Sequence, residues 1–182
     1  MNILDMKFMK NFIKIILLMG ISLILLIGCS SKEQEKNIDN FINKLLSVKT
    51  YEGITFGEDL DKYTEESKAN FGEYFTENGF DALMANRILY FYYTVINENN
   101  VKNITDIKIV KTKESENDTY TNYEFIHYEY EVSYKLKLDD KSIDMTDYMS
   151  FKLMKDNTSI IDEVYILDKT SSIFSEYRNV SQ

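Results

Sequence analysis

The chain has 182 residues, of which 44% are hydrophobic and 28% charged, and its formal net charge is −9. A surface this acidic repels phosphate backbones, so nucleic acid is a poor candidate partner. Cys29 is the only cysteine, which excludes a disulfide within the chain.

The first thirty residues have the layout of a secretory signal. Three lysines precede an almost uninterrupted apolar run over 15–27, as in the basic and apolar regions of signal peptides. The run ends in Leu-Ile-Gly-Cys at 26–29, which resembles the lipobox of bacterial lipoproteins. The resemblance implies that Cys29 receives a diacylglycerol on its sulfur and that a signal peptidase cuts after Gly28. Two acyl chains hold a protein stably on a bilayer, here on the extracytoplasmic face.

Two other interpretations of this segment remain open. A transmembrane anchor needs about 20 apolar residues, whereas 12–28 supplies seventeen with Lys14 among them. A structural cysteine in a packed core is the other alternative, although its surroundings offer little for such a core.

Cleavage after Gly28 predicts four parts of the chain. They are a signal peptide at 1–28, a lipidated tether at 29–36, one domain at 37–168 and a C-terminal tail at 169–182. Because the first 28 residues hold three Lys and one Asp, the remaining 154 carry 18 basic and 29 acidic side chains, a net charge of −11. That length suits a single domain.

Apolar residues at helical spacing predict three helices in the first half of the mature chain. They are expected at 36–49, 64–75 and 80–87. Residues 88–96 are rich in aromatic and β-branched side chains, which favours a strand or extended chain. Their position after a helix also permits helical continuation.

From residue 101 the hydrophobic period changes to two, which is typical of strands. Strands are expected at 107–110, 120–138, 143–153 and 160–167, with a polar turn at 114–119, a hairpin at 139–141 and a turn at 156–158. The tail carries little pattern beyond one helical turn. Helices followed by antiparallel strands predict an α+β fold with the helices packed on one sheet face.

Two segments carry a resemblance to a known fold. One is Tyr-Phe-Thr-Glu-Asn-Gly-Phe at 74–80 running into Asn86-Arg87, and the other is the three-strand meander over 126–167. Together they resemble the nuclear-transport-factor-like domains, and the element order is similar to that of small secreted lipoproteins of clostridia. The resemblance spans 36–168 and implies a curved, cystatin-like, cone-shaped sheet of about four strands. It implies no activity, since this fold hosts enzymes, transport factors and scaffolds.

Asp147 is the most unusual candidate site residue. It shares the strand phase of Met145, Met149 and Phe151, so a regular strand would point its carboxylate into the core. A buried carboxylate without a partner is costly. We therefore favour a bulge or an exposed strand end at Asp147, and a wet cavity lined by Asp147 is the alternative. In enzyme members of the resembled fold, an acidic residue or a tyrosine in that cavity transfers protons.

Three further residues complete the candidate pocket. His127 is the only histidine and is interpreted as a surface or strand-edge residue, with a pocket role as the alternative. Arg87 is either a partner for a carboxylate or a charge favoured by a helix dipole. Tyr130 is expected in the core, or as a stacking group if the sheet is open on one side. The sequence contains no metal-ligand spacing, nucleophile motif or phosphate loop, so no metal or cofactor is expected.

The first functional hypothesis is a non-enzymatic lipoprotein that binds a protein or small ligand through its sheet. The alternatives are a subunit of a conjugation or secretion-type envelope assembly, and a small pocket enzyme of the isomerase or dehydratase kind. A cavity on which Asp147, His127 and a tyrosine converge would favour ligand binding or catalysis. A solidly packed interior would favour protein interaction.

Overall fold

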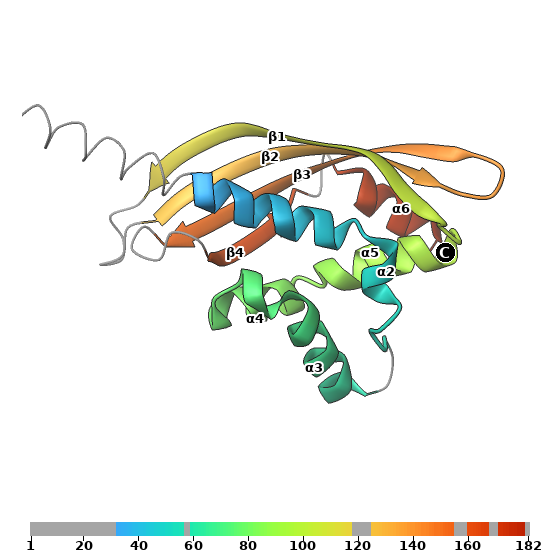
Figure 1. Ribbon diagram of the computed structural model, residues 1–182, viewed down its shortest axis with the longest axis horizontal. Helices are drawn as coiled ribbons and strands as arrows, with labels where there is room; N and C mark the ends of the chain where they lie inside the picture. Colours follow the sequence, from blue (N-terminus) through green and yellow to red (C-terminus); the bar gives the residue numbers. More distant parts are fainter. Residues whose placement is uncertain (1–31, 57–58, 118–124, 155–159, 168–170, 181–182) are drawn as a thin grey trace, which may run out of the picture.

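A computed structural model of the chain describes residues 32–56, 59–117, 125–154, 160–167 and 171–180. Cys29, the signal segment and the turn expected at 156–158 lie outside these residues. The fold is α+β, as predicted: helices come first, and a four-stranded antiparallel sheet packs against them (Figure 1).

The sheet is a meander in which each strand pairs with the next along the chain, in the order β1-β2-β3-β4. The strands are β1 Asn103–Asn117, β2 Phe125–Lys137, β3 Ser142–Met154 and β4 Ile161–Ile166. The predicted hairpin at 139–141 joins β2 to β3, and these two strands pair without a register shift. The sheet is not strongly curled (Figure 1), so the cone shape stays a prediction.

Strand β1 is longer than the sequence predicts. The polar turn expected at 114–119 is wrong for its described part, because β1 continues through Glu114 to Asn117. Two register shifts interrupt its pairing with β2, so that Lys111 lies opposite Tyr130 and Glu114 lies opposite Tyr128. Both tyrosines are buried. Charged residues of β1 therefore share the helix-covered face of the sheet, which the simple alternation of a strand does not predict.

The first described helix covers residues 32–45 and lies along the covered face of the sheet (Figure 1). Its apolar stripe includes Ile38, Phe41 and Leu45, all fully buried. The Phe41 ring packs edge-on against Phe75 and Phe151, with centroids 4.9 and 6.0 Å away. The helix includes residues 32–36, which the sequence assigned to a tether.

Three short helices and a 3-10 turn follow, and side-chain caps begin two of them. They are α2 Val48–Tyr51, α3 Leu60–Phe71, η1 Gly72–Tyr74 and α4 Glu77–Ala85. Asp59 accepts from the Lys62 amide to begin α3, and Thr76 accepts from the Gly79 amide to begin α4. Gly79 allows α4 to approach β4, since a Cβ there would overlap the Ile161 carbonyl oxygen.

The segment expected to be a strand at 88–96 is helix α5, Ile88–Glu98. Its buried residues are Ile88, Leu89, Tyr92, Val95 and Ile96, which recur at the three-and-four spacing of one helix face. The expected strand is wrong because the buried side chains follow the helical spacing, although their aromatic and β-branched content favours a strand. Tertiary packing overrides such a preference.

The C-terminal segment forms helix α6, Ser172–Val180, rather than a single turn. Phe91 of α5 packs edge-on against Phe174 and Tyr177 of α6, with centroids 4.9 and 4.8 Å apart. Ile173 is buried in the core. The residues expected as a tail therefore complete the helical layer. Among the described residues, no helix combines the length and apolar character needed to cross a bilayer.

Candidate functional site

Asp147 lies in an unbroken strand, so the bulge or exposed end favoured from the sequence is wrong. Strand β3 pairs regularly with β2 on either side of it, with Asp147 opposite Val132. The side chain is fully buried on the covered face. Its carboxylate therefore points into the core, where it needs partners.

Three donors from three different elements satisfy this carboxylate. Its Oδ2 atom accepts from the hydroxyls of Tyr92 on α5 and Tyr134 on β2, at 2.7 and 2.6 Å. Its Oδ1 atom accepts from the backbone amide of Ile173 in the first turn of α6, at 2.9 Å. We call these four residues the Asp147 cluster. It links α5 and α6 to the middle of the sheet.

Burial sets the protonation of the Asp147 cluster. Desolvation raises the pKa of Asp147, and the hydrogen bonds from Tyr134, Ile173 and Tyr92 lower it by less. Desolvation and the nearby Asp147 charge raise the pKa of both tyrosines well above the usual value. Both hydroxyls therefore keep their protons and donate to the carboxyl group. The cluster therefore holds α5 and α6 against β2 and β3 through buried hydrogen bonds.

The other candidate pocket residues do not join Asp147. His127 lies opposite Lys152 on the uncovered face of the sheet, whereas Asp147 is buried on the covered face. Tyr130 is buried on the covered face, and its hydroxyl has no hydrogen-bond partner among the residues described. Burial and nearby carboxylates raise its pKa.

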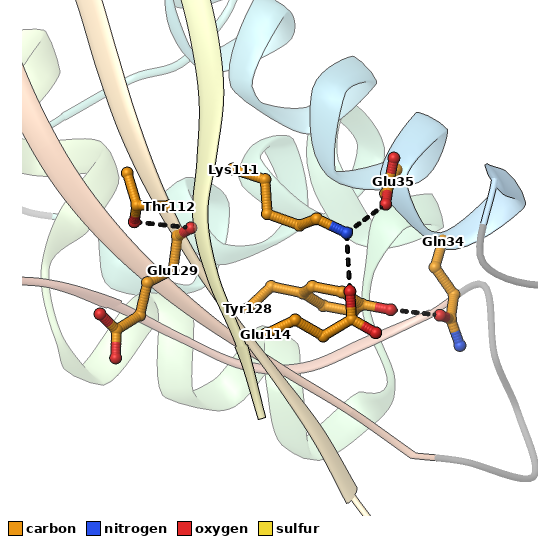
Figure 2. A network of polar contacts seen from close by, with 7 residues as sticks. All are labelled: Gln34, Glu35, Lys111, Thr112, Glu114, Tyr128 and Glu129. Atoms are coloured by element: carbon orange, nitrogen blue, oxygen red, sulfur yellow. Dashed lines mark hydrogen bonds and ion pairs between the residues drawn. The ribbon is translucent and has the colours of Figure 1, made fainter. Parts of the chain in front are cut away.

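A second polar network anchors the start of the first helix to the sheet (Figure 2). Tyr128 on β2 donates a 2.7 Å hydrogen bond to Gln34 Oε1, and both side chains are buried. Lys111 on β1 contacts Glu35 at 2.5 Å and Glu114 at 2.7 Å. The two carboxylates raise the pKa of Lys111. This network fixes residues that were expected to be a tether.

A cavity of about 760 Å³ opens elsewhere, among the helices. Five aromatic side chains from the segment before α3 and from α3, α5 and α6 line it: Phe56, Tyr63, Tyr90, Tyr93 and Tyr177. We call it the aromatic cavity. Leu60 and Met84 add apolar surface, and Leu60 is 68% exposed. The cavity is therefore open to solvent.

Ring packing shapes the walls of the aromatic cavity. Phe56 stacks on Tyr93 with centroids 3.7 Å apart, and Tyr63 lies 4.8 Å from Phe56 at a tilted angle. Tyr90 meets Tyr177 edge-on at 6.2 Å. Burial raises the pKa of Tyr63 to about 12. The cavity therefore combines aromatic ring surface with phenol hydroxyls.

Two charged side chains, Asp81 and Arg87, line the aromatic cavity together with the hydroxyl of Thr64. Arg87 is the one member of the candidate pocket set that lies there. Its backbone is left-handed, with φ 54°, at the junction between α4 and α5. Its guanidinium has no hydrogen-bond or ion-pair partner within the described ranges. Arg87 lies two residues after the end of α4 at Ala85 and is the N-cap residue of α5.

The sequence analysis missed the aromatic residues of this cavity. Tyr90 and Tyr93 are three residues apart on the less buried side of α5, and they align only once the segment is recognised as a helix. Phe56 and Tyr177 lie more than 100 residues apart in sequence, so only the tertiary fold brings them together.

The uncovered face of the sheet carries charged pairs instead of an apolar surface. Lys113 contacts Glu129 and Lys152 contacts Glu163, each at 2.9 Å. No group of three or more His, Cys, Asp or Glu side chains suited to a metal ion occurs among the described residues. The aromatic cavity is therefore the candidate ligand site among the described residues.

Comparisons with protein-family models, with curated proteins and with solved structures gave no match.

Proposed function

We propose that this protein is a lipid-anchored, non-enzymatic binding protein that holds a small ligand in the aromatic cavity on the extracytoplasmic side of a membrane. The observation that carries the ligand proposal is the cavity itself. Its volume of about 760 Å³ falls within the range of about 300–1,000 Å³ found for small-molecule sites. Its walls combine aromatic and aliphatic surface with hydroxyl groups and the charged side chains of Asp81 and Arg87, which can orient a ligand.

The anchor is supported by the Leu-Ile-Gly-Cys sequence at 26–29, which follows a basic start and an apolar run. The anchor would leave the acidic domain outside the membrane, attached through Cys29. The finer fold assignment, a cystatin-like cone, is supported by the order of helices and meander strands and by the resemblance at 74–80.

The location of the ligand departs from the first functional hypothesis, which used the sheet. The uncovered sheet face carries the ion pairs Lys113–Glu129 and Lys152–Glu163, whereas aromatic side chains line a solvent-open hollow at the aromatic cavity. The Asp147 cluster supports a non-enzymatic role, because its donors already occupy both carboxylate oxygens.

Mass spectrometry of the native protein from membranes tests both parts of the proposal. We expect the chain to begin at Cys29 with a diacylglycerol on sulfur, and a Cys29→Ser variant to keep its leader. Native spectra should also contain a bound small molecule that the Tyr93→Ala variant loses. Tyr165→Ala on the exposed part of β4 is the matched control and should retain it. Wild-type protein without a bound small molecule would contradict the proposed ligand site. An unmodified Cys29 thiol would contradict the proposed lipid anchor.

A further inference from the structure

We infer that the ligand of the aromatic cavity is an amphipathic carboxylate, a small molecule with a planar or apolar body and one carboxylate that pairs with Arg87. This inference rests on the proposed function and specifies the chemistry of its ligand. Three independent features of the cavity carry it: the backbone at Arg87, the charges in the wall and the aromatic lining.

The backbone at Arg87 is strained. A left-handed conformation is unfavourable for a residue other than Gly, Asn or Asp, and Arg87 adopts it at φ 54°. Glycine would make the same turn between α4 and α5 without this cost. The junction therefore holds a long basic side chain at a position where the backbone alone favours glycine, and strain of this kind concentrates at ligand sites.

The charges in the cavity wall select an anion with one negative charge. Among the described residues of the lining, Arg87 is the only basic one, within a mature chain of net charge −11. A guanidinium binds a carboxylate through two parallel hydrogen bonds. Asp81 also lines the cavity, so a second negative charge on the ligand would meet its carboxylate. A dianionic phosphate is disfavoured for the same reason.

The lining selects the body of the ligand. Tyr63, Tyr90 and Tyr93 supply ring faces and edges, and Met84 supplies a flexible thioether surface. Such walls favour a planar or apolar group, because aromatic pairs attract each other beyond the effect of the area they bury. The predicted ligand therefore combines this body with a carboxylate directed at Arg87.

A matched pair of probes tests the inference: 1-naphthylacetate and its neutral isostere 1-naphthylacetamide. Binding is measured by equilibrium dialysis of the mature lipoprotein in dodecyl maltoside against protein-free micelles, so that partition into detergent cancels. We expect the carboxylate to bind at least about tenfold more tightly than the amide, the factor that 1.4 kcal/mol of pairing gives. Arg87→Gln should abolish this preference by weakening the binding of the carboxylate.

Two controls keep the result specific. Lys68→Gln removes one positive charge from the exposed side of α3, outside the cavity lining, and should keep the tenfold preference. Tyr93→Ala should weaken both probes together. Circular dichroism and thermal melting of each variant show whether it is folded.

The outcomes separate this inference from the proposed function. Equal affinity of the wild-type protein for the two probes overturns the inference that the ligand carries a carboxylate. The aromatic cavity would then remain a site for a neutral ligand. A preference that survives in Arg87→Gln also overturns the role of Arg87. If neither probe binds and native mass spectra show no bound small molecule, the proposal that the aromatic cavity is a ligand site is overturned.

Discussion

Tyr134 donates a 2.6 Å hydrogen bond to Asp147, joining neighbouring strands β2 and β3 at a fully buried carboxylate. The same carboxylate accepts from Tyr92 and from the start of α6. This buried carboxylate therefore connects β3 to β2, α5 and α6. Removing it should weaken the packing of all four elements.

We expect Asp147→Ala to lower the free energy of unfolding by about 3–5 kcal/mol, because it leaves buried donors without an acceptor. Asp147→Asn keeps one acceptor oxygen and should cost less. Urea unfolding measures both. Asp144→Asn, on the same strand with a side chain 85% exposed, is the control and should change stability by no more than about 0.5 kcal/mol. Similar losses at the two positions would contradict the role of the cluster.

The raised pKa of Asp147 predicts a pH dependence of this effect. A carboxyl group whose pKa is higher in the folded state binds more protons there than when unfolded, so its contribution to stability falls as pH rises from its ordinary value near 3.8 through the raised value. The difference in unfolding free energy between wild type and Asp147→Asn should therefore shrink between pH 4 and pH 7. A difference that grows over this range would show that the hydrogen bonds outweigh burial.

Gln34→Ala should destabilise the protein by about 1–2 kcal/mol, because it removes the buried acceptor of the Tyr128 hydroxyl. Glu33→Ala, on the exposed side of the same helix, should be close to neutral. Thermal unfolding of the two variants distinguishes a helix that belongs to the domain from a tether. If Gln34→Ala also proved neutral, residues 32–36 would serve only as a linker.

Gly79→Ala should destabilise by about 1–3 kcal/mol, the usual cost of overpacking. The new Cβ overlaps backbone atoms of β4, which cannot rotate away. This cost should exceed the gain of about 1 kcal/mol that alanine brings within a helix. Gly53→Ala is the control, since nothing lies within 4 Å of its added Cβ. A more stable Gly79→Ala protein would mean that α4 and β4 separate easily.

Arg87→Gly should raise the melting temperature by about 2–4 °C, corresponding to relief of about 1 kcal/mol of backbone strain. Asn100 has a similar left-handed backbone, with φ 52°, but asparagine tolerates this conformation. Asn100→Gly should therefore gain less. Calorimetry of both variants checks the comparison, and a less stable Arg87→Gly protein would show that the side chain itself stabilises the junction.

The pattern of the sequence predicted the fold class and most strands, because alternation along β2 and β3 is regular and the hairpin at 139–141 is polar and short. It misassigned α5, where helical spacing and strand-like composition pointed in opposite directions. It also ended β1 early, since the register shifts place Lys111 and Glu114 on the covered face. Local composition carries no information about either shift.

The candidate site was less accessible to sequence analysis. Asp147 was recognised as unusual from its phase alone, but its donors come from three elements, one of them the expected tail. Arg87 was singled out for its place at a helix end, whereas its backbone conformation and the rings around it emerge only from the assembled helices. Pairings across more than 100 residues leave no trace in a single sequence.

Tyr177 forms part of the cavity wall although it follows all four strands in the chain. A chain exported from its N-terminus onward would thus build its sheet and most of its helices before the binding surface exists. Losing a few residues by proteolytic trimming near α6 would remove that wall while sparing the sheet, so a cut between Ile173 and Tyr177 should cost the protein its ligand well before its fold, because Ile173 keeps its hydrogen bond to Asp147.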